Sequence, residues 1–502
     1  MTAFVLSAAF FILGTVLFAA ANRMASPGPR KKEAANRLLE GASVFFVAVL
    51  VYWGLTALLG RPVSVFFLCV LAMAVFVAGN ALKVRLLGEV LLFSDAFLVG
   101  HALRFPRLYF GYVPVWTWGV LALAVVVLAA EIAQEPASVS LQKFAFVVWL
   151  AGFFGAAWAL WRVCRNADAF LRVHAPSFRA QEDAARFTTL GAMLVHTVSF
   201  LTKADSVRKR FDLDARVCGK PSAPAAALRK VAGPRHFVLI QAESFCPAGR
   251  ILRRPSTTPF LDALLEEPEA GRLLLDWRGA YTMRTEFSVL TGVKTTELQA
   301  YAFDPYQLAR RIPMDSLARD FRALGYETQA WHPNDGRFFD RFAVMPHLGF
   351  SRLMDIAAFA DLPKAGRYAS DEALLAEAAR YLAGCTRPTF LFIITLEAHG
   401  PWSGRGEQQL RQYEEHLAGL DRGVKTLIQG LEATNPGSTV ALYGDHLPSL
   451  PAFAEASSDT VWFAHACAPS ERHTQSPGNS VDLPAHALRE RLLAFHEGAA
   501  AR

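Results

Sequence analysis

The sequence has few charged residues for its length, and its cysteines show no metal-binding pattern. Of its 502 residues, 19% are charged and 53% are hydrophobic. The six cysteines contain no CxxC pair and no spacing typical of a zinc site, and their pairing cannot be read from the sequence. No recognisable nucleic-acid module accompanies the net charge of +7. Neither a cysteine-ligated zinc protein nor a nucleic-acid-binding protein is therefore indicated.

The basic residues cluster instead beside long apolar runs, as in RKKEAANR (30–37) and WRVCRNADAFLR (161–172). Such clusters are typical of contact with anionic lipid headgroups. The charge therefore predicts a membrane as partner, and no nucleic acid.

Five apolar runs are each about 20 residues long, enough to cross the hydrocarbon core of a bilayer. The first is too long and too evenly apolar for a cleaved signal, which predicts an uncleaved signal-anchor. We predict a transmembrane domain of about five spans over residues 1–162. The runs cover residues 3–22, 42–60, 63–82, 112–132 and 142–161.

Between the third and fourth runs, residues 80–105 are apolar but contain Glu89, Asp95 and His101. Because charge inside a membrane is costly, we expect an interfacial or re-entrant segment whose acids reach water, with a sixth crossing as the alternative. With five spans, the positive-inside rule puts the C-terminal part on the cytoplasmic side, and with six on the opposite side. The sequence alone leaves the side open.

A juxtamembrane linker with interfacial helices is predicted over residues 163–233. Residues 187–201 have apolar side chains at mixed helical spacing, which favours a helix on the membrane surface. Residues 219–235 are rich in proline, alanine and glycine, which is typical of a domain boundary. A globular domain is predicted over residues 234–502.

Short apolar runs alternate with helical segments in this globular part. This alternation predicts a parallel sheet covered by helices on both faces. Ligands of such sheets bind at the carboxyl ends of the strands. The four candidate strands cover residues 236–242, 326–331, 389–396 and 438–444.

Acidic and histidine side chains follow each of these strands. Taken singly, each has an ordinary structural interpretation as a cap, loop or core residue. Together they indicate one site, and acid and imidazole ligands suit a divalent metal of the zinc or manganese kind. The residues are Glu243, His332, His399, Asp445 and His446.

The stretch TMRTEFSVLTG (282–292) is typical of a loop entering a helix, where free N–H groups favour a phosphate. A metal would activate the hydroxyl of Thr282 as a nucleophile. The alternative is that Thr282 only caps the helix, with Thr285 and Glu286 as competing caps.

Five motifs resemble, in order, those of lipoteichoic acid synthase-like, sulfatase-fold phosphoglycerol transferases. Residues 80–95 (NALKVRLLGEVLLFSD) are also similar to a membrane-proximal motif of bacterial members. The resemblance implies an N-terminal multi-span α-helical membrane domain plus a C-terminal α/β sulfatase-like (alkaline phosphatase-like) domain with a mostly parallel sheet. The motifs are QAESF (241–245), YTMRTEFSVLTG (281–292), HPNDGRFFDR (332–341), TLEAHGPW (395–402) and YGDHLPS (443–449).

The resemblance also implies a metal-dependent reaction. One divalent cation, manganese or else magnesium or zinc, would be held by four residues: Glu243, Thr282, Asp445 and His446. The same threonine would attack the headgroup phosphorus of phosphatidylglycerol or phosphatidylethanolamine, releasing diacylglycerol and leaving a phosphothreonine. A glycan or glycerol-phosphate acceptor would then take the group.

The substrate side of the site is implied in the same way. Arg341 and His399 would bind phosphoryl or glycerol oxygens, and Phe339 would line the pocket. His332 is a weaker pocket candidate. The resemblance implies a bacterial cytoplasmic (inner) membrane protein whose catalytic domain is periplasmic or extracellular.

Two departures limit the resemblance: Ala280-Tyr281, and the Ser/Pro-rich APSERHTQSPGNS (468–480) in place of much of a longer closing region, which is expected to alter acceptor binding. Ala280-Tyr281 stands where the family commonly has small residues, which is expected to narrow the pocket. A true sulfatase needs a C/S-x-P-x-R context, and CPAGR (246–250) has its proline one position early. A phosphodiesterase transferring to water and a non-catalytic membrane sensor remain alternatives, whereas the absence of paired interrupted spans disfavours a transporter.

Overall fold

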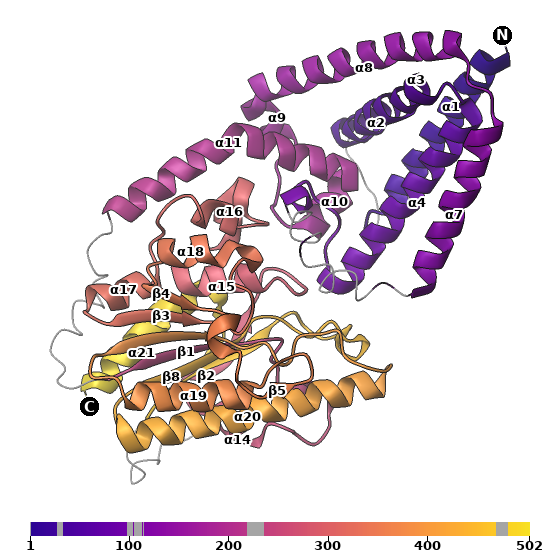
Figure 1. The fold of residues 1–502 in the computed structure, drawn as a ribbon. Coiled ribbons are helices and arrows are strands. Elements are labelled where there is room, and N and C mark those ends of the chain that lie inside the picture. The colour runs from indigo at the N-terminus through magenta and orange to yellow at the C-terminus, as the bar shows by residue number, and fades with distance from the viewer. Residues whose placement is uncertain are drawn as a thin grey trace. The chain divides into compact units, whose positions relative to one another are not determined.

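The chain forms two compact units, Met1–Ala204 and Asp205–Arg502 (Figure 1). The computed structural model describes residues 2–27, 34–97, 104, 113, 115–217, 235–467 and 480–501. His101 and Cys218, and the first residues of the run at 112–132, lie outside the described residues. The predicted limits of the linker and of the globular domain stay predictions.

Five helices of the first unit are long and apolar enough to cross a membrane. Large apolar side chains such as Val126 and Trp158 are exposed on them, as expected for surfaces that face lipid. The helices α10 (Ala180–Phe187) and α11 (Thr189–Val217) are bent at their junction by 114°, and would count as a sixth span if they were one. The five are α1 (Thr2–Met24), α2 to α3 (Ala34–Leu59), α4 (Pro62–Leu87), α7 (Val115–Gln134) and α8 (Val139–Arg165).

Asp95, in the segment after α4, is bonded within the protein. Lys83 Nζ lies 2.7 Å from Asp95 and donates to the carbonyl of Val90 at 2.9 Å. The backbone N–H of Leu92 also donates to Asp95, at 2.6 Å. Asp95, expected to reach water, is therefore held by an ion pair and a backbone donor, the usual solution for charge near an apolar phase.

An eight-stranded, mostly parallel sheet forms the second unit, in the order β10-β2-β9-β8-β1-β7-β3-β4. The four predicted strands are four consecutive members: β8 (Thr439–Gly444), β1 (Phe237–Ala242), β7 (Thr389–Ile394) and β3 (Glu327–Trp331). All three pairs among them are parallel, so their carboxyl ends meet at one edge. Four strands of this sheet were not predicted: β2 (Ala270–Leu274), β4 (Arg352–Met354), β9 (Thr460–Ala466) and β10 (Leu483–Pro484).

Helices cover both faces of this sheet, which confirms the predicted fold class. Every residue of β1 is buried. Val238 and Ile240 join the apolar core shared with α19 (Asp371–Ala383) and α20 (Glu407–Thr434). On the opposite face, the Phe237 ring lies 4.8 Å from that of Phe321 in α17 (Leu317–Ala323). Burial on both faces explains why these strands are continuously apolar.

Candidate functional site

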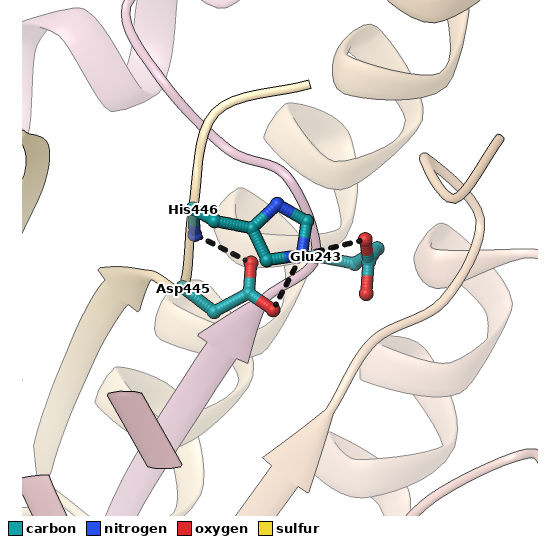
Figure 2. Close-up of side chains that lie close together, drawn as sticks. All are labelled: Glu243, Asp445 and His446. Atoms are coloured by element: carbon teal, nitrogen blue, oxygen red, sulfur yellow. Dashed lines mark hydrogen bonds and ion pairs between the residues drawn. The ribbon is translucent and has the colours of Figure 1, made fainter. Parts of the chain in front are cut away.

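Three predicted metal ligands meet at the carboxyl edge of the sheet. Glu243 directly follows β1, while Asp445 and His446 directly follow its parallel neighbour β8. Their ligand atoms all lie within 4.8 Å of one another, and all three side chains are buried (Figure 2). His446 Nε2 is 3.5 Å from Glu243 Oε1 and 3.3 Å from Asp445 Oδ2. The cluster therefore forms because β1 and β8 are neighbours in the sheet, although its residues are far apart in the sequence.

The backbone around these ligands requires particular residues. A Cβ at Gly444 would lie 2.0 Å from the carbonyl oxygen of Phe245, so only glycine fits between β8 and the chain after β1. Ser244 has a φ of 53°, in the left-handed region. Its N–H donates to Asp445 at 2.8 Å and its hydroxyl donates to Glu243 at 2.8 Å. Ser244 therefore bonds to both carboxylates.

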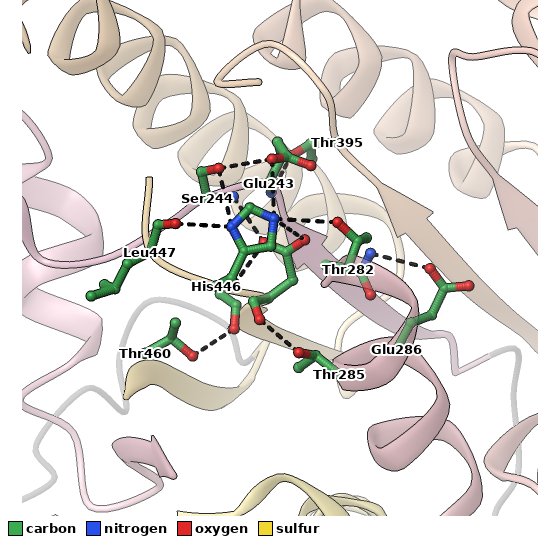
Figure 3. A network of polar contacts seen from close by, with 12 residues as sticks. Glu243, Ser244, Thr282, Thr285, Glu286, Thr395, His446, Leu447 and Thr460 are labelled. Atoms are coloured by element: carbon green, nitrogen blue, oxygen red, sulfur yellow. Dashed lines mark hydrogen bonds and ion pairs between the residues drawn. The ribbon is translucent and has the colours of Figure 1, made fainter. Parts of the chain in front are cut away.

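The ring of His446 is oriented for ligation. Its Nδ1 lies 3.0 Å from the carbonyl oxygen of Leu447, an arrangement that suits an Nδ1–H donor. Nε2 then faces the two carboxylates, so its lone pair would be available to a cation held between them, as in the usual arrangement of a metal-binding histidine. Figure 3 shows this ring at the centre of the polar network.

Electrostatics also favour a cation here. Burial raises the pKa of Asp445 to about 7; the charge of His446 opposes this shift and that of Glu243 adds to it. Burial lowers the pKa of His446, but the charges of Asp445 and Glu243 outweigh it and the pKa is raised. Two buried carboxylates beside one imidazole repel each other unless a positive charge lies between them. The donor set fits a divalent cation.

Thr282 is the first residue of α15 (Thr282–Thr291), and its hydroxyl lies 3.3 Å from His446 Nε2. It is half-buried, whereas the nine other residues of α15 are buried. The N-cap is Tyr281, which makes no side-chain cap bond, so none of Thr282, Thr285 and Glu286 is the N-cap residue. The structure thus leaves one accessible side chain on this helix, at the metal cluster (Figure 3).

Tyr281, which directly precedes Thr282, is not exposed beside it. Its side chain is buried, and the Arg284 guanidinium lies 3.7 Å from the centre of its ring. Arg284 also donates to the carbonyl of Phe303 at 3.1 Å. The aromatic ring therefore packs within the protein under a cation.

Arg341 is the first residue of α18 (Arg341–His347) and is buried. Its Nη2 donates to Glu286 Oε2 at 2.7 Å. The half-buried Phe339 has a φ of 55°, and its ring centre lies 5.5 Å from Cζ of Arg341. Two successive left-handed residues, Phe339 and Asp340, thus precede the arginine, a strain typical of functional segments.

The two remaining predicted histidines follow β3 and β7. Burial, and then the charge of Arg341, hold the pKa of His332 well below its ordinary value. His332 is buried, with Nδ1 3.2 Å from the carbonyl of Ile394. His399 Nδ1 lies 2.5 Å from the carbonyl of Gly400 and 3.3 Å from the hydroxyl of Tyr368.

The sequence analysis did not identify the residues that hydrogen-bond to the candidate site residues. These are Ser244, Glu286 and Tyr368. Glu286 was considered only as a cap, although its spacing of four from Thr282 places it one helical turn further along α15. Ser244 and Tyr368 gave no recognisable signal. Each acts through a partner distant in the sequence or through a backbone angle.

Comparison with known proteins shows the family to which the chain belongs. The sulfatase family model matches residues 235–499, more than half of the chain. The chain therefore belongs to the sulfatase family, and the predicted family resemblance is confirmed at that level.

Two curated relatives come from Rhizobium meliloti (strain 1021). One is named capsular polysaccharide biosynthesis protein RkpI and is 28% identical over 459 residues, which cover 87% of this chain and 83% of that protein. The other is named a putative cyclic beta-1,2-glucan modification protein and is 30% identical over 246 residues, 46% of this chain and 38% of that protein.

A solved structure, the lipoteichoic acid synthase LtaP from Listeria monocytogenes, is 21% identical with a TM-score of 0.44. The match covers 54% of this chain and 77% of that one. At this identity and TM-score, nothing about activity follows from it.

Proposed function

We propose that this chain is a membrane-bound, metal-dependent transferase. It moves a phospholipid headgroup, phosphoglycerol or phosphoethanolamine, onto an envelope glycan through a phosphothreonine at Thr282. The observation that carries the proposal is that Thr282 is the one accessible residue of α15 and lies beside the cluster of Glu243, Asp445 and His446. The order of the family motifs and the curated relative named for capsular polysaccharide biosynthesis support it.

In the first step, the Thr282 oxygen forms a bond to the headgroup phosphorus and the bond from phosphorus to the diacylglycerol oxygen breaks. The hydroxyl proton ends on the released diacylglycerol. A divalent cation, manganese by preference, held by Glu243, Thr282, Asp445 and His446, would lower the pKa of the threonine hydroxyl. In the second step, an acceptor hydroxyl displaces Thr282 and regenerates it.

The remaining site residues bind the group in transit. Arg341 and His399 contact phosphoryl or glycerol oxygens, which spreads the negative charge of the transition state. Phe339 lines the headgroup pocket and His332, held neutral, borders it. The apolar helices keep the chain at its lipid donor, in the bacterial cytoplasmic membrane with the catalytic unit outside the cytoplasm.

The test uses the purified full chain in lipid vesicles with Mn²⁺ and labelled phosphatidylglycerol or phosphatidylethanolamine. Wild type is expected to release diacylglycerol and Thr282→Val to lose release, while Thr426→Val, an exposed threonine of α20, keeps it. Mass spectrometry of the trapped adduct on Thr282 names the headgroup. Equal release by wild type and Thr282→Val would overturn the nucleophile.

A further inference from the structure

Glu286 is the centre of a buried hydrogen-bond network behind the candidate site. Its carboxylate accepts from Arg341 Nη2 at 2.7 Å, from Gln241 Nε2 at 3.2 Å and from the hydroxyl of Tyr306. The hydroxyl of Tyr443 donates to Gln241 Oε1 at 2.5 Å, which turns the amide N–H₂ towards Glu286. The network joins α15, α18, β1, β8 and α16 (Tyr306–Ala309).

The charges in this network balance. The side chains of Glu286 and Arg341 are 0% and 1% exposed, so neither charge is solvated by water. A buried ion is tolerated only when it is paired and its remaining lone pairs are bonded, a condition that three donors meet for Glu286. Burial, with the Glu286 charge added, raises the pKa of Tyr306 well above its ordinary value, so the phenol keeps its proton and donates.

Not every N–H group of Arg341 is hydrogen-bonded within this network. Its Nη2 is bonded to Glu286, but its Nε is buried and has no hydrogen-bond partner in the described part of the chain. A buried N–H group without an acceptor is rare in native proteins and marks a place where a ligand oxygen fits.

We propose that Glu286 is the positioning residue for Arg341: it accepts from Nη2 and leaves the Nε–H group for a phosphoryl oxygen. Glu286 lies one turn after Thr282 on α15, so nucleophile and phosphate-binding group take their positions from the same helix. The inference rests on the proposed function, because it takes a phosphoryl group as the ligand of Arg341. A guanidinium held at one edge binds an anion with little loss of side-chain freedom.

A double-mutant cycle on the purified full chain tests this, with Glu286→Gln, Arg341→Met and both together. The probe is glycerol phosphate, whose Kd is measured by calorimetry in the presence of Mn²⁺, with the Kd for Mn²⁺ measured separately. Glu286→Gln is expected to weaken probe binding by roughly 10- to 100-fold, the usual effect of losing a charged hydrogen bond, without changing Mn²⁺ affinity. In the Arg341→Met background the same change is expected to have no further effect.

Two controls separate positioning from folding. Tyr306→Phe keeps the ion pair and removes one donor to Glu286, so a smaller weakening of probe binding is expected, and this variant decides the matter if Glu286→Gln does not fold. Asp421→Asn, which changes a buried acid that accepts from Leu261 far from the network, is expected to leave the probe Kd unchanged.

The inference is overturned if Glu286→Gln leaves the probe Kd unchanged, if its effect is additive with Arg341→Met, or if wild type does not bind the probe. The proposed function is judged separately, by diacylglycerol release from wild type and Thr282→Val. Probe binding that follows the cycle without lipid turnover would remove the proposed function and keep the role of Glu286.

Discussion

Ser244 bonds to two of the candidate metal ligands without being a candidate ligand itself. Its left-handed backbone lets its N–H reach Asp445 while its hydroxyl reaches Glu243. Groups that bond to metal ligands in this way fix the direction of each carboxylate. The strain of a non-glycine residue at this φ is consistent with a functional position.

Ser244→Ala is therefore expected to weaken Mn²⁺ binding by roughly 10- to 100-fold, because Glu243 loses its hydroxyl donor. Ser244→Gly is the matched control, since it removes the same hydroxyl but relieves the backbone strain. A Mn²⁺ titration of both variants checks this. Full affinity in Ser244→Gly, with loss only in Ser244→Ala, would show that backbone strain and not the hydroxyl matters.

The sequence predicted those site residues that directly follow a strand. Glu243, Asp445 and His446 each come directly after a strand whose apolar pattern is plain, so parallel pairing alone brings them together. Glu286 could not be assigned in this way. Its function depends on Arg341, 55 residues later, and that contact comes from tertiary packing with no periodic pattern in the sequence.

The ends of β1 and β8 approach each other so closely that there is no room for a side chain at Gly444. A Cβ at Gly444 would meet the backbone oxygen of Phe245, which has no freedom to move aside. The residues that would be displaced are the neighbours of Glu243 and Asp445. The distance between these strand ends therefore sets how far apart the candidate metal ligands Glu243 and Asp445 lie.

Gly444→Ala is accordingly expected to destabilise the protein by about 1–3 kcal/mol, the usual cost of overpacking, and to abolish tight Mn²⁺ binding. Gly498→Ala is the control: no atom lies within 4 Å of its added Cβ, and in α21 (Leu488–Ala501) alanine stabilises a helix by up to about 1 kcal/mol. Thermal unfolding and Mn²⁺ titration are the measurements. Native affinity in Gly444→Ala would contradict the prediction.

The start of α19 is bound to the loop that carries His399. Asp371 accepts the N–H groups of Leu396 and Glu397, each at 3.2 Å, and Glu397 accepts the N–H of Asp371 at 2.7 Å. Burial, and then the charge of Glu397, raises the pKa of Asp371 to about 8. The folded protein therefore holds a proton here that the unfolded chain releases above about pH 4.

Because the folded pKa is the higher one, the free energy of unfolding is expected to fall as pH rises from about 4 to about 8. Asp371→Asn keeps an acceptor oxygen and removes the titration. Its stability relative to wild type should grow with pH, by at most about 1.4 kcal/mol per unit, and level off above about pH 8. Denaturant unfolding of both proteins between pH 5 and 9 checks this; a constant difference would refute the raised pKa.

Strand prediction succeeded for the four parallel neighbours β8, β1, β7 and β3 and failed for the other four strands, among them the interior strand β9. The four central strands are buried on both faces and therefore read as continuous apolar runs. β10 has only two residues and β4 three, too short to give a pattern. β2 contains Gly271 and Arg272, whose backbone approach to Val481 and ion pair with Asp482 are visible only after folding.

At the scale of the whole molecule, the two units have separate roles. All candidate ligands lie in the second unit, which has its own sheet and apolar core, whereas the five long apolar helices lie in the first. A unit with its own core is expected to fold alone.

A fragment of residues 235–502 is therefore expected to bind Mn²⁺ as the full chain does, yet to release diacylglycerol from vesicles on the order of 10-fold more slowly or worse, because it is no longer tethered to its donor. Soluble glycerol phosphate serves as the control ligand, for which both proteins should have the same Kd. Equal lipid turnover by fragment and full chain would show that the apolar helices are not needed for access to lipid.

Thr285 links the helix that carries Thr282 to the backbone of Asp445, and this link does not depend on a bound ion. Its hydroxyl donates to the backbone carbonyl of Asp445 at 2.7 Å, three residues along α15 from Thr282. The helix is thereby bonded to the main chain of a ligand, not to its metal-binding oxygens. Thr282, the proposed nucleophile, is thus aligned with the candidate ligands by the folded backbone, and exchange of a bound ion is expected to leave that alignment unchanged.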